Sequence, residues 1–326
     1  MLQGTIYELL THPNPVLDTR QQVKGPVTRN TEYVKLEREN VSIWHDFTFE
    51  NIEAAYSHLF SIGPIQSEAV HPYPRGSPSE IRTEDSVDKI SYYWNALVCR
   101  YPFKIGCERL QTALGLVRTD VSMAKGELPS PPLDGGRDMH PDWSIYLRDE
   151  RRTILVWGDS KCSSKWSSTN TRSDNWIWPF RQLATYCVND STRYGYVITP
   201  DELVALRVIM DPISRCGYRL EYRAIPWSQH GPHVLTVNLA IWALAMMSVN
   251  DGHRSIAPQD WTLPLNIWWQ DINRRTGQVS YEHHLSARTA QQLPPGAIAH
   301  QRPTALPPQY IPEEPQTVRR STRNRR

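Results

Sequence analysis

Two aspartates and a lysine stand at the ends of two neighbouring apolar runs in the middle of the chain. Asp142 precedes the run 143–147, while Asp159 and Lys161 follow the run 153–157. A charged turn separates the two runs, which is typical of a β-hairpin. Antiparallel pairing brings Asp142 back beside Asp159, and Lys161 shares a face with Asp159 because strand residues two apart point the same way. The sequence therefore predicts a metal site with an adjacent cation at one end of a sheet.

A helix predicted over 176–189 follows the hairpin, after a polar Ser/Thr-rich loop. Asp174 or Asn175 can cap its start. Gln182 and Tyr186 are four residues apart and therefore lie on one face of this helix. The helix adds two polar side chains that can approach the hairpin.

Apolar periodicity predicts further elements on both sides of this unit. Helical spacing occurs over 51–62, 84–99 and 236–249; β-rich runs occur over 194–199, 203–209 and 219–225; and 103–117 fits either a strand or a short helix. The order of helix, hairpin, helix, strands and helix predicts an α/β sandwich around a mixed sheet.

Composition predicts a folded core with irregular flanks, because hydrophobic residues make up only 39% of the chain and prolines number 26. We expect four parts, which are an N-terminal, partly helical extension at 1–79, a folded domain at 80–255, a C-terminal extension at 256–292, and a Pro-rich linker with a basic disordered tail at 293–326.

Charge and cysteine usage bound the class of protein. The formal net charge of +2 indicates neither nucleic-acid nor membrane binding by itself. Five widely spaced cysteines without a Cys-x-x-Cys pair, and a start without a charged and apolar leader, argue against a secreted disulfide framework. The longest apolar run, 234–249, is interrupted and too short to span a membrane. We expect an intracellular protein, and the basic end TVRRSTRNRR is typical of nuclear-import or polyanion-binding tails and of solvated disordered ones.

The conjunction of motifs resembles the PD-(D/E)xK nuclease signature. PD at 141–142 precedes DSK at 159–161 by the length of a hairpin, and QLATY at 182–186 is similar to the Q-x-x-x-Y motif of the RecB-like branch. The stretches RYGYVITPDELVALRV and RAIPWSQHGP are similar to fungal PD-(D/E)xK nuclease-like proteins. The resemblance covers roughly residues 80–250 and implies a restriction-endonuclease-like αβββαβ core, with a mixed central sheet flanked by helices.

The resemblance also implies a metal-dependent nuclease. Asp142 and Asp159, with the backbone carbonyl of Ser160, would hold Mg²⁺ or Mn²⁺, because such ions prefer oxygen ligands and Mg²⁺ keeps several waters beside one or two carboxylates. Lys161 would orient or deprotonate the attacking water and offset charge in the transition state. The expected partner is nucleic acid, with DNA favoured over RNA.

Further positions follow from the same resemblance. Glu84, with Glu80 as second choice, would supply the acid of the first motif. Gln182 and Tyr186 would position the water or the substrate phosphate. Candidates for contacts with backbone phosphates are Lys165, Arg172 and Arg181.

Other functions remain open for the same residues. Gly158-Asp159-Ser160 imitates the nucleophile block of GDSL-type hydrolases, with Ser160 as nucleophile, but the sequence contains no Asp-x-x-His pair for the relay. A catalytically inactive nuclease-fold module would also keep the acidic cluster, for binding or protein interaction. In a purely structural reading, Asp159 and Lys161 form an exposed ion pair on one strand face.

Two histidine pairs need a separate interpretation. His230 and His233 are separated by two residues in a loop, and His283 and His284 are adjacent near the C-terminus. Neither pair has a further ligand set at zinc spacing, so both are expected at the surface.

Overall fold

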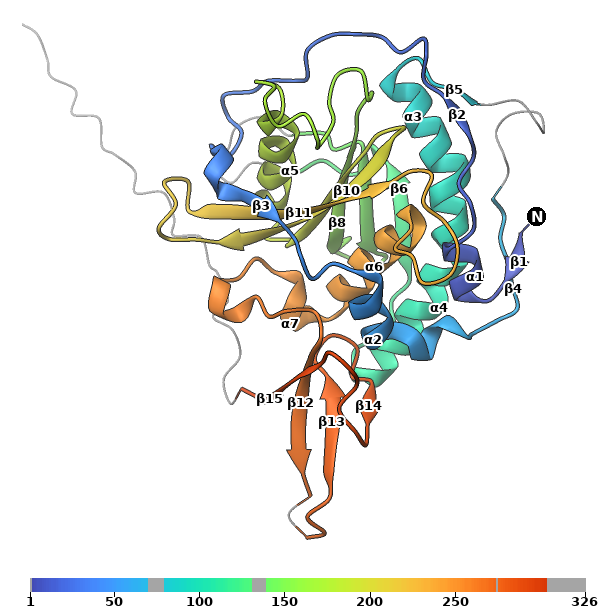
Figure 1. Cartoon of the computed structure of the whole chain (residues 1–326), viewed down its shortest axis with the longest axis vertical. Helices are drawn as coiled ribbons and strands as arrows, with labels where there is room; N and C mark the ends of the chain where they lie inside the picture. The colour runs from blue at the N-terminus through green and yellow to red at the C-terminus, as the bar shows by residue number, and fades with distance from the viewer. Residues whose placement is uncertain (1, 70–78, 131–138, 274, 304–326) are drawn as a thin grey trace, which may run out of the picture.

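A seven-stranded mixed sheet forms the centre of the computed structural model, which describes residues 2–69, 79–130, 139–273 and 275–303 (Figure 1). The strand order is β3-β11-β10-β9-β8-β7-β6, and neighbours are antiparallel except for the parallel pairs β8–β9 and β3–β11. The strands are β3 (Val41–Ile43), β6 (Val121–Lys125), β7 (Trp143–Leu147), β8 (Ile154–Ser160), β9 (Tyr194–Ile198), β10 (Glu202–Met210) and β11 (Tyr218–Pro226). The basic tail and the end of the Pro-rich linker, 304–326, lie outside the described residues.

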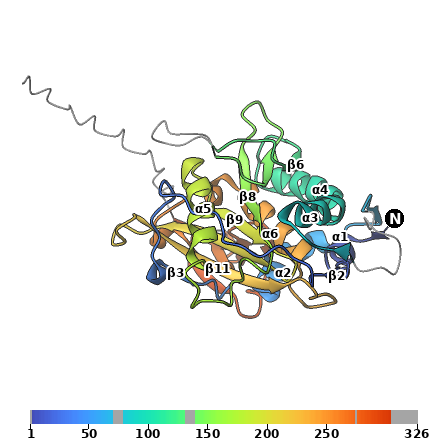
Figure 2. The same cartoon turned by 90° about the horizontal axis from the view of Figure 1, so that it is seen from above.

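Helices cover both faces of this sheet (Figure 2). α4 (Leu97–Ala113) and α6 (Val237–Val249) pack in one apolar cluster, and α5 (Ile177–Asn189) packs in a second. A continuous helical run of α3 (Glu84–Ile90) and a π-helical turn (Ser91–Ala96) leads into α4. The chain then forms β6, β7, β8, α5 and β9 in turn. The predicted α/β class is confirmed, with its αβββαβ order and mixed sheet flanked by helices.

The two apolar clusters explain why the central strands read as continuous apolar runs. On β10, Leu203 and Ala205 belong to the cluster around α6, whereas Val204, Leu206 and Val208 belong to the cluster around α5. Successive side chains point to opposite faces of a strand, so a strand covered on both sides is apolar at every position. α6 lies wholly inside its layer and all of its side chains are buried.

The crossover between β8 and β9 determines where α5 lies. These two strands are parallel, with Val156 opposite Tyr194, so the chain must return to the same end of the sheet before β9 begins. α5 makes that return over one face, close to the end of β8. The parallel pair therefore places the helix that carries Gln182 beside the strand that ends in Asp159.

The N-terminal region packs into the main core. α1 (Ile6–Leu10) and α2 (Phe49–Phe60) contribute buried side chains to the cluster that contains α6. α2 corresponds to the helix predicted at 51–62. Two short pairings tie this region down further, β1 (Gln3–Gly4) with β4 (Ile65–Gln66), and β2 (Leu17–Asp18) with β5 (Ser79–Glu80). Within the described ranges, no helix combines the length and apolar character needed to cross a membrane.

A second, four-stranded sheet forms most of the C-terminal region and projects away from the central sheet (Figure 1). Its strands are β12 (Ile267–Ile272), β13 (Val279–His283), β14 (Thr289–Ala290) and β15 (Ile298–Gln301), and the short helices α7 (Asp251–Arg254) and η3 (Gln259–Trp261) precede it. The prediction that His283 and His284 are surface residues is wrong. Both are buried: Trp268 lies opposite His283 and packs edge-on against its ring, and His284 packs against the rings of His253 and Trp269. His230 and His233 are exposed, as predicted.

Two further segments differ from the sequence pattern in instructive ways. The ambiguous stretch 103–117 continues α4 as far as Ala113, although Pro102 stands inside the helix. The π-helical turn before it changes the local hydrogen-bond register, where a proline without an N–H can be accommodated. β6 was not predicted, because the strand is short, its residues are mixed in polarity, and it lies at the edge of the sheet.

Candidate active site

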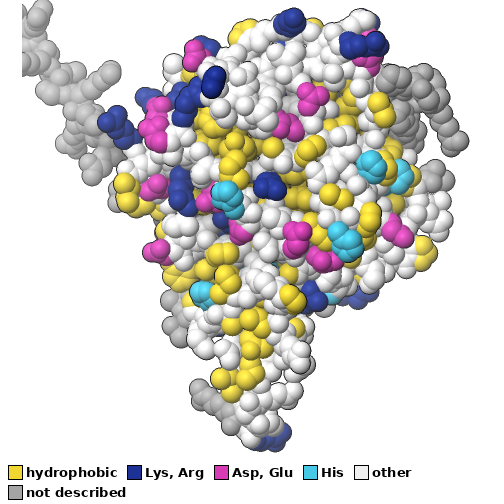
Figure 3. Space-filling view, in the orientation of Figure 1, with side chains coloured by type: hydrophobic (Ala, Val, Ile, Leu, Met, Phe, Trp, Pro, Cys, Tyr) yellow, Lys and Arg dark blue, Asp and Glu magenta, His cyan; other side chains and the backbone are white. Residues whose placement is uncertain are grey.

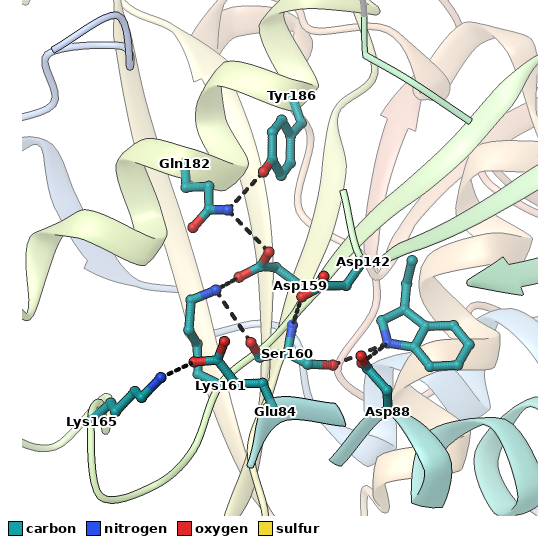
Figure 4. A network of polar contacts seen from close by, with 10 residues as sticks. Glu84, Asp88, Asp142, Asp159, Ser160, Lys161, Lys165, Gln182 and Tyr186 are labelled. Atoms are coloured by element: carbon teal, nitrogen blue, oxygen red, sulfur yellow. Dashed lines mark hydrogen bonds and ion pairs between the residues drawn. The ribbon is translucent and has the colours of Figure 1, made fainter. Parts of the chain in front are cut away.

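The β7–β8 hairpin brings Asp142 and Asp159 together as predicted. The strands pair with Trp143 opposite Gly158, so the next pair outward is Asp142 and Asp159. The backbone N–H of Ser160 donates a hydrogen bond to Oδ2 of Asp142 at 2.9 Å. Figure 4 shows the two carboxyl groups converging from the two strands. The hairpin thus fixes one carboxyl against the backbone of the strand that carries the other.

Asp159 and Lys161 form a buried pair. Their exposed fractions are 2% and 3%, and Nζ of Lys161 donates to Oδ2 of Asp159. The same ammonium donates to the backbone carbonyl of Ser160 at 3.2 Å. An exposed ion pair on one strand face is therefore excluded. A lysine with so little exposure requires its acidic partners, because an unpaired buried charge is strongly unfavourable.

Gln182 and Tyr186 reach the site from α5. Nε2 of Gln182 donates to Oδ1 of Asp159 at 3.1 Å and to Oη of Tyr186 at 2.7 Å (Figure 4). Both side chains are buried. Oε1 of Gln182 is also buried but accepts no hydrogen bond from the described residues. The structure therefore brings both predicted helix residues to Asp159 and leaves one acceptor open.

The charges at this site are not balanced. Burial and, to a smaller extent, the neighbouring charge of Asp159 raise the pKa of Asp142 to about 8, although Lys161 opposes the change. Burial alone would lower the pKa of Lys161, but the charges of Asp159 and Asp142 outweigh it and raise that pKa above its usual range. Lys161 therefore stays an ammonium. One cation faces two carboxyl groups, and the proton on Asp142 compensates for the missing positive charge.

The donor set fits a hard divalent cation with few protein ligands. Asp142, Asp159 and the Ser160 carbonyl supply oxygen atoms, and the open Oε1 of Gln182 can accept a hydrogen bond from a water. Over the described residues, no cluster of three or more His, Cys, Asp or Glu side chains has the geometry to hold a metal ion. Mg²⁺ is compatible with such a site, because it takes one or two carboxylates and completes its shell with water.

Glu84 lies at the edge of the site. It stands in the first turn of α3, and its Oε1 accepts from Nζ of Lys165 at 3.1 Å (Figure 4). Its charge acts on Asp159 and Lys161, although no hydrogen bond joins it to either. The second-choice acid, Glu80, instead pairs with the neighbouring Arg82 at 2.9 Å.

Asp88 is an acid of the same helix that sequence reasoning missed. It is buried and accepts from Nε1 of Trp143 at 3.1 Å, and Nζ of Lys125 lies 2.9 Å from its carboxylate. Nε1 of Trp143 also donates to Oγ of Ser160 at 3.0 Å (Figure 4). The available signal was its position one helical turn after Glu84. Asp88 is thereby linked through Trp143 to the strand that carries Asp159.

Ser160 is placed as a structural residue and not as a nucleophile. Its side chain is buried, and the hydrogen-bond partner of its Oγ is Trp143. A hydrolase relay needs a histidine at hydrogen-bond distance from the serine. The observed partner cannot accept the serine proton.

The three predicted phosphate contacts differ in their surroundings. Lys165 is occupied by Glu84, and Arg172 is exposed in the loop before α5. Arg181 donates to the carbonyl of Leu36 at 2.7 Å and lies over the ring of Trp178. On the face of the molecule that Figure 3 shows, Lys and Arg side chains are interspersed with Asp and Glu side chains.

Comparison with known proteins adds little to this geometry. No family model matches the sequence, and no match was found among curated proteins. Among solved structures, the cryoEM structure of a DrdV–DNA complex is similar with a TM-score of 0.23 and 9% identity. That similarity covers 51% of this chain and 13% of the other chain. A likeness at this level carries no argument about activity or partner.

Proposed function

We propose that the chain is a metal-dependent nuclease of the PD-(D/E)xK type that hydrolyses phosphodiester bonds of nucleic acid, with DNA favoured over RNA. The observation that carries the proposal is the buried pair of Asp159 and Lys161, with the half-buried Asp142 beside it and Gln182 in contact from α5. Strongly perturbed, incompletely neutralised carboxyl groups are typical of functional sites. The motifs PD, DSK and QLATY are brought into one cluster by the hairpin and the crossover helix.

Each residue has a distinct role in this proposal. Asp142, Asp159 and the Ser160 carbonyl would hold Mg²⁺ or Mn²⁺, which supplies positive charge against the phosphate and lowers the pKa of an attacking water. Lys161 keeps its proton, so it would stabilise negative charge in the transition state by donating hydrogen bonds and would not act as the base. Gln182 would orient the attacking water through its open Oε1.

A cleavage assay tests the proposal directly. Labelled single-stranded and double-stranded DNA are incubated with the purified chain in Mg²⁺ or Mn²⁺, with EDTA as the metal-free control. We expect metal-dependent cleavage that Asp159→Asn reduces by at least about a hundredfold, since it removes a charged metal ligand. Asp174→Asn is the matched control, because Asp174 is exposed in the loop before α5. Absence of cleavage by the wild type, or equal cleavage by Asp159→Asn, would contradict the proposal.

One observation favours a second candidate, a catalytically inactive module of the same fold. Lys161 donates to Asp159 and to the Ser160 carbonyl, two of the three groups proposed to hold the cation. In an inactive module the ammonium takes the place of the ion permanently. Binding of nucleic acid without cleavage under every metal condition, together with no effect of Mg²⁺ on thermal stability, is the result that this alternative predicts.

A further inference from the structure

A segment far away in the sequence crosses the end of the sheet at the candidate active site. Residues 22–36, here called the strap, run between β2 and β3 over the edge where β8 ends and α5 begins. Figures 1 and 2 show this dark blue run passing over that edge from two directions. The strap is buried at Val27, Tyr33 and Leu36, so it packs against the domain along its length.

Hydrogen bonds tie the strap to the elements on both sides of the site. At its start, the N–H of Val23 donates to the Arg82 carbonyl at 2.8 Å, and Ser164 donates from its N–H to Oε1 of Gln22 at 3.0 Å and from its Oγ to the Val23 carbonyl at 2.8 Å. At its end, the N–H of Val34 donates to Oγ1 of Thr185 at 2.8 Å, and Nε of Arg181 donates to the Leu36 carbonyl at 2.7 Å. The strap is therefore anchored at the start of α3, at the loop after β8 and along α5.

Beneath the strap lies a pocket of about 680 Å³. Asn30, Glu32 and Tyr33 line it from the strap, and Gln182 and Tyr186 line it from α5. Gln182 connects it to the acidic cluster, because its Nε2 donates to Asp159 at 3.1 Å. The volume falls within the range of pockets that enclose one small organic ligand, about 300–1,000 Å³. Gln182 thus borders both the pocket and the acidic cluster.

The pocket lining suits a nucleobase better than a phosphate chain. Among the described residues that line it there is no Lys or Arg, and Glu32 adds a negative charge that repels phosphates. Its remaining lining includes the rings of Tyr33, Tyr186 and His140 and the amides of Asn30 and Gln182. Aromatic rings stack on bases, and amides can pair with base edges.

We infer that this pocket receives one unpaired nucleotide, so that the site takes single-stranded ends or unpaired nucleotides and excludes the backbone of intact duplex. The inference rests on the proposed function for the identity of the ligand as nucleic acid. A base seated between the strap and α5 would leave its phosphate directed past Gln182 toward Asp159 and Lys161. Duplex phosphates lie on the outside of a stiff helix, and the strap separates them from Asp159 and Lys161, which are almost fully buried. Enzymes with enclosed sites reach a nucleotide only when it is unstacked from its neighbours.

Fluorescence anisotropy tests the inference apart from cleavage. The probes are a labelled oligodeoxythymidylate of about 12 nucleotides and a blunt hairpin duplex of the same length, both measured in Ca²⁺. The wild type is expected to bind the single strand at least about tenfold more tightly. Tyr33→Ala is expected to weaken single-strand binding by about tenfold through loss of the stacking ring, whereas Tyr33→Phe retains it. Tyr93→Ala, an exposed tyrosine of the π-helical turn, is the matched control.

The outcomes separate the two proposals. Equal or tighter binding of the hairpin, no binding of either probe, or full single-strand affinity in Tyr33→Ala overturns the pocket assignment, even if the chain cleaves DNA. Selective single-strand binding that Tyr33→Ala weakens and Tyr33→Phe preserves supports the assignment, even if no metal yields cleavage and the proposed nuclease activity fails. A folded Tyr33→Ala protein, verified by circular dichroism, is required for the comparison, and loss of affinity in Tyr33→Phe as well also overturns the assignment.

Discussion

Two buried groups of charges lie on the same central sheet and differ in how completely they are neutralised. The first surrounds Arg207 on β10, whose guanidinium bonds to Glu221 at 2.7 Å and lies 3.6 Å from Asp46. Arg219 reaches the other oxygen of Glu221 at 3.1 Å, and the Arg207 guanidinium packs over Trp44 at 4.6 Å. Two arginines therefore face two carboxylates, so the formal charges of this group balance.

The second group, around Asp159 at the end of β8, lacks this balance. Lys161 is the cation bonded to it, and the second carboxyl, Asp142, has its pKa raised to about 8 chiefly by burial. Gln182 contributes a buried acceptor that finds no partner in the described part of the chain. A complete ion network stabilises the fold, whereas an incomplete one keeps the capacity to bind a cation or a substrate. The candidate site differs from the group around Arg207 in how far its carboxyl charges are balanced by cations, more than in burial itself.

Replacing the central cation of each group by methionine is expected to give the largest difference between the two groups, in cleavage for Lys161 and in stability for Arg207. Lys161→Met is expected to reduce kcat/KM for DNA cleavage by roughly a thousandfold, because the ammonium would no longer offset transition-state charge. Single-turnover cleavage in Mg²⁺ measures the effect. Lys104→Met, an exposed lysine of α4, is the matched control and is expected to cleave normally. If Lys161→Met stays folded and retains wild-type cleavage, the lysine has no catalytic role.

Arg207→Met is expected to show the opposite pattern. Removal of the buried arginine leaves Glu221 and Asp46, whose side chains are 13% and 25% exposed, without this partner, which costs roughly 1.5–3 kcal/mol of unfolding free energy. Urea denaturation measures the loss, and cleavage per folded molecule is expected to remain unchanged. A strongly reduced kcat/KM in the folded fraction of Arg207→Met would show that the two groups are coupled.

The local parts of the site were predictable from the sequence. The register of Asp142 with Asp159 follows from two apolar runs around one turn, since strand periodicity leaves few alternatives. Gln182 and Tyr186 share a helix face by spacing alone. The order of helix, hairpin, helix, strands and helix was also accessible, because those elements are strongly patterned, whereas β6 was missed and the αβββαβ order came from the family resemblance.

Residues contributed through tertiary contacts were not predictable. Asp88 looks like any solvated acid near a helix start, and only the packing of Trp143 against it reveals its position. Tyr33 lies in a segment without periodicity and reaches the site because the strap is anchored at distant residues such as Thr185. His283 is buried by a sheet whose short strands carry little pattern. The positions of these residues depend on which surfaces pack together in the folded chain, and local sequence propensity does not predict that packing.

The pH dependence of stability provides a further test of incomplete compensation. Burial holds the pKa of Asp142 at about 8 in the native protein, against 3.8 for the ordinary carboxyl. Between these values the native state binds a proton that the unfolded state lacks, so the free energy of unfolding falls as pH rises from about 4 to about 8. In EDTA we expect a loss on the order of 5 kcal/mol from this group, because each unit of difference in pKa corresponds to about 1.4 kcal/mol. Urea denaturation at several pH values measures it.

Asp142→Asn and Mg²⁺ should both reduce this loss. The variant cannot ionise, and a bound cation would favour the ionised carboxylate of the wild type. Asp190 also has a pKa raised by burial, to about 6, so Asp190→Asn should change the dependence only below about pH 6.5. An unchanged loss between about pH 6.5 and 8 in Asp142→Asn would assign the effect to another group.

Two buried glutamines allow the finest test of the same comparison. Gln111 on α4 has both amide atoms paired with Thr119, at 3.1 Å and 2.9 Å, whereas Oε1 of Gln182 is open. Gln111→Met is expected to cost about 1–2 kcal/mol of unfolding free energy and leave cleavage intact, since it abandons buried backbone groups. Gln182→Met removes the open acceptor together with two donated hydrogen bonds, to Asp159 and Tyr186, so it should also cost about 1–2 kcal/mol of unfolding free energy, whereas cleavage falls about tenfold. If Gln111→Met loses cleavage and Gln182→Met retains it, the open acceptor is a packing imperfection and the group around Asp159 is structural.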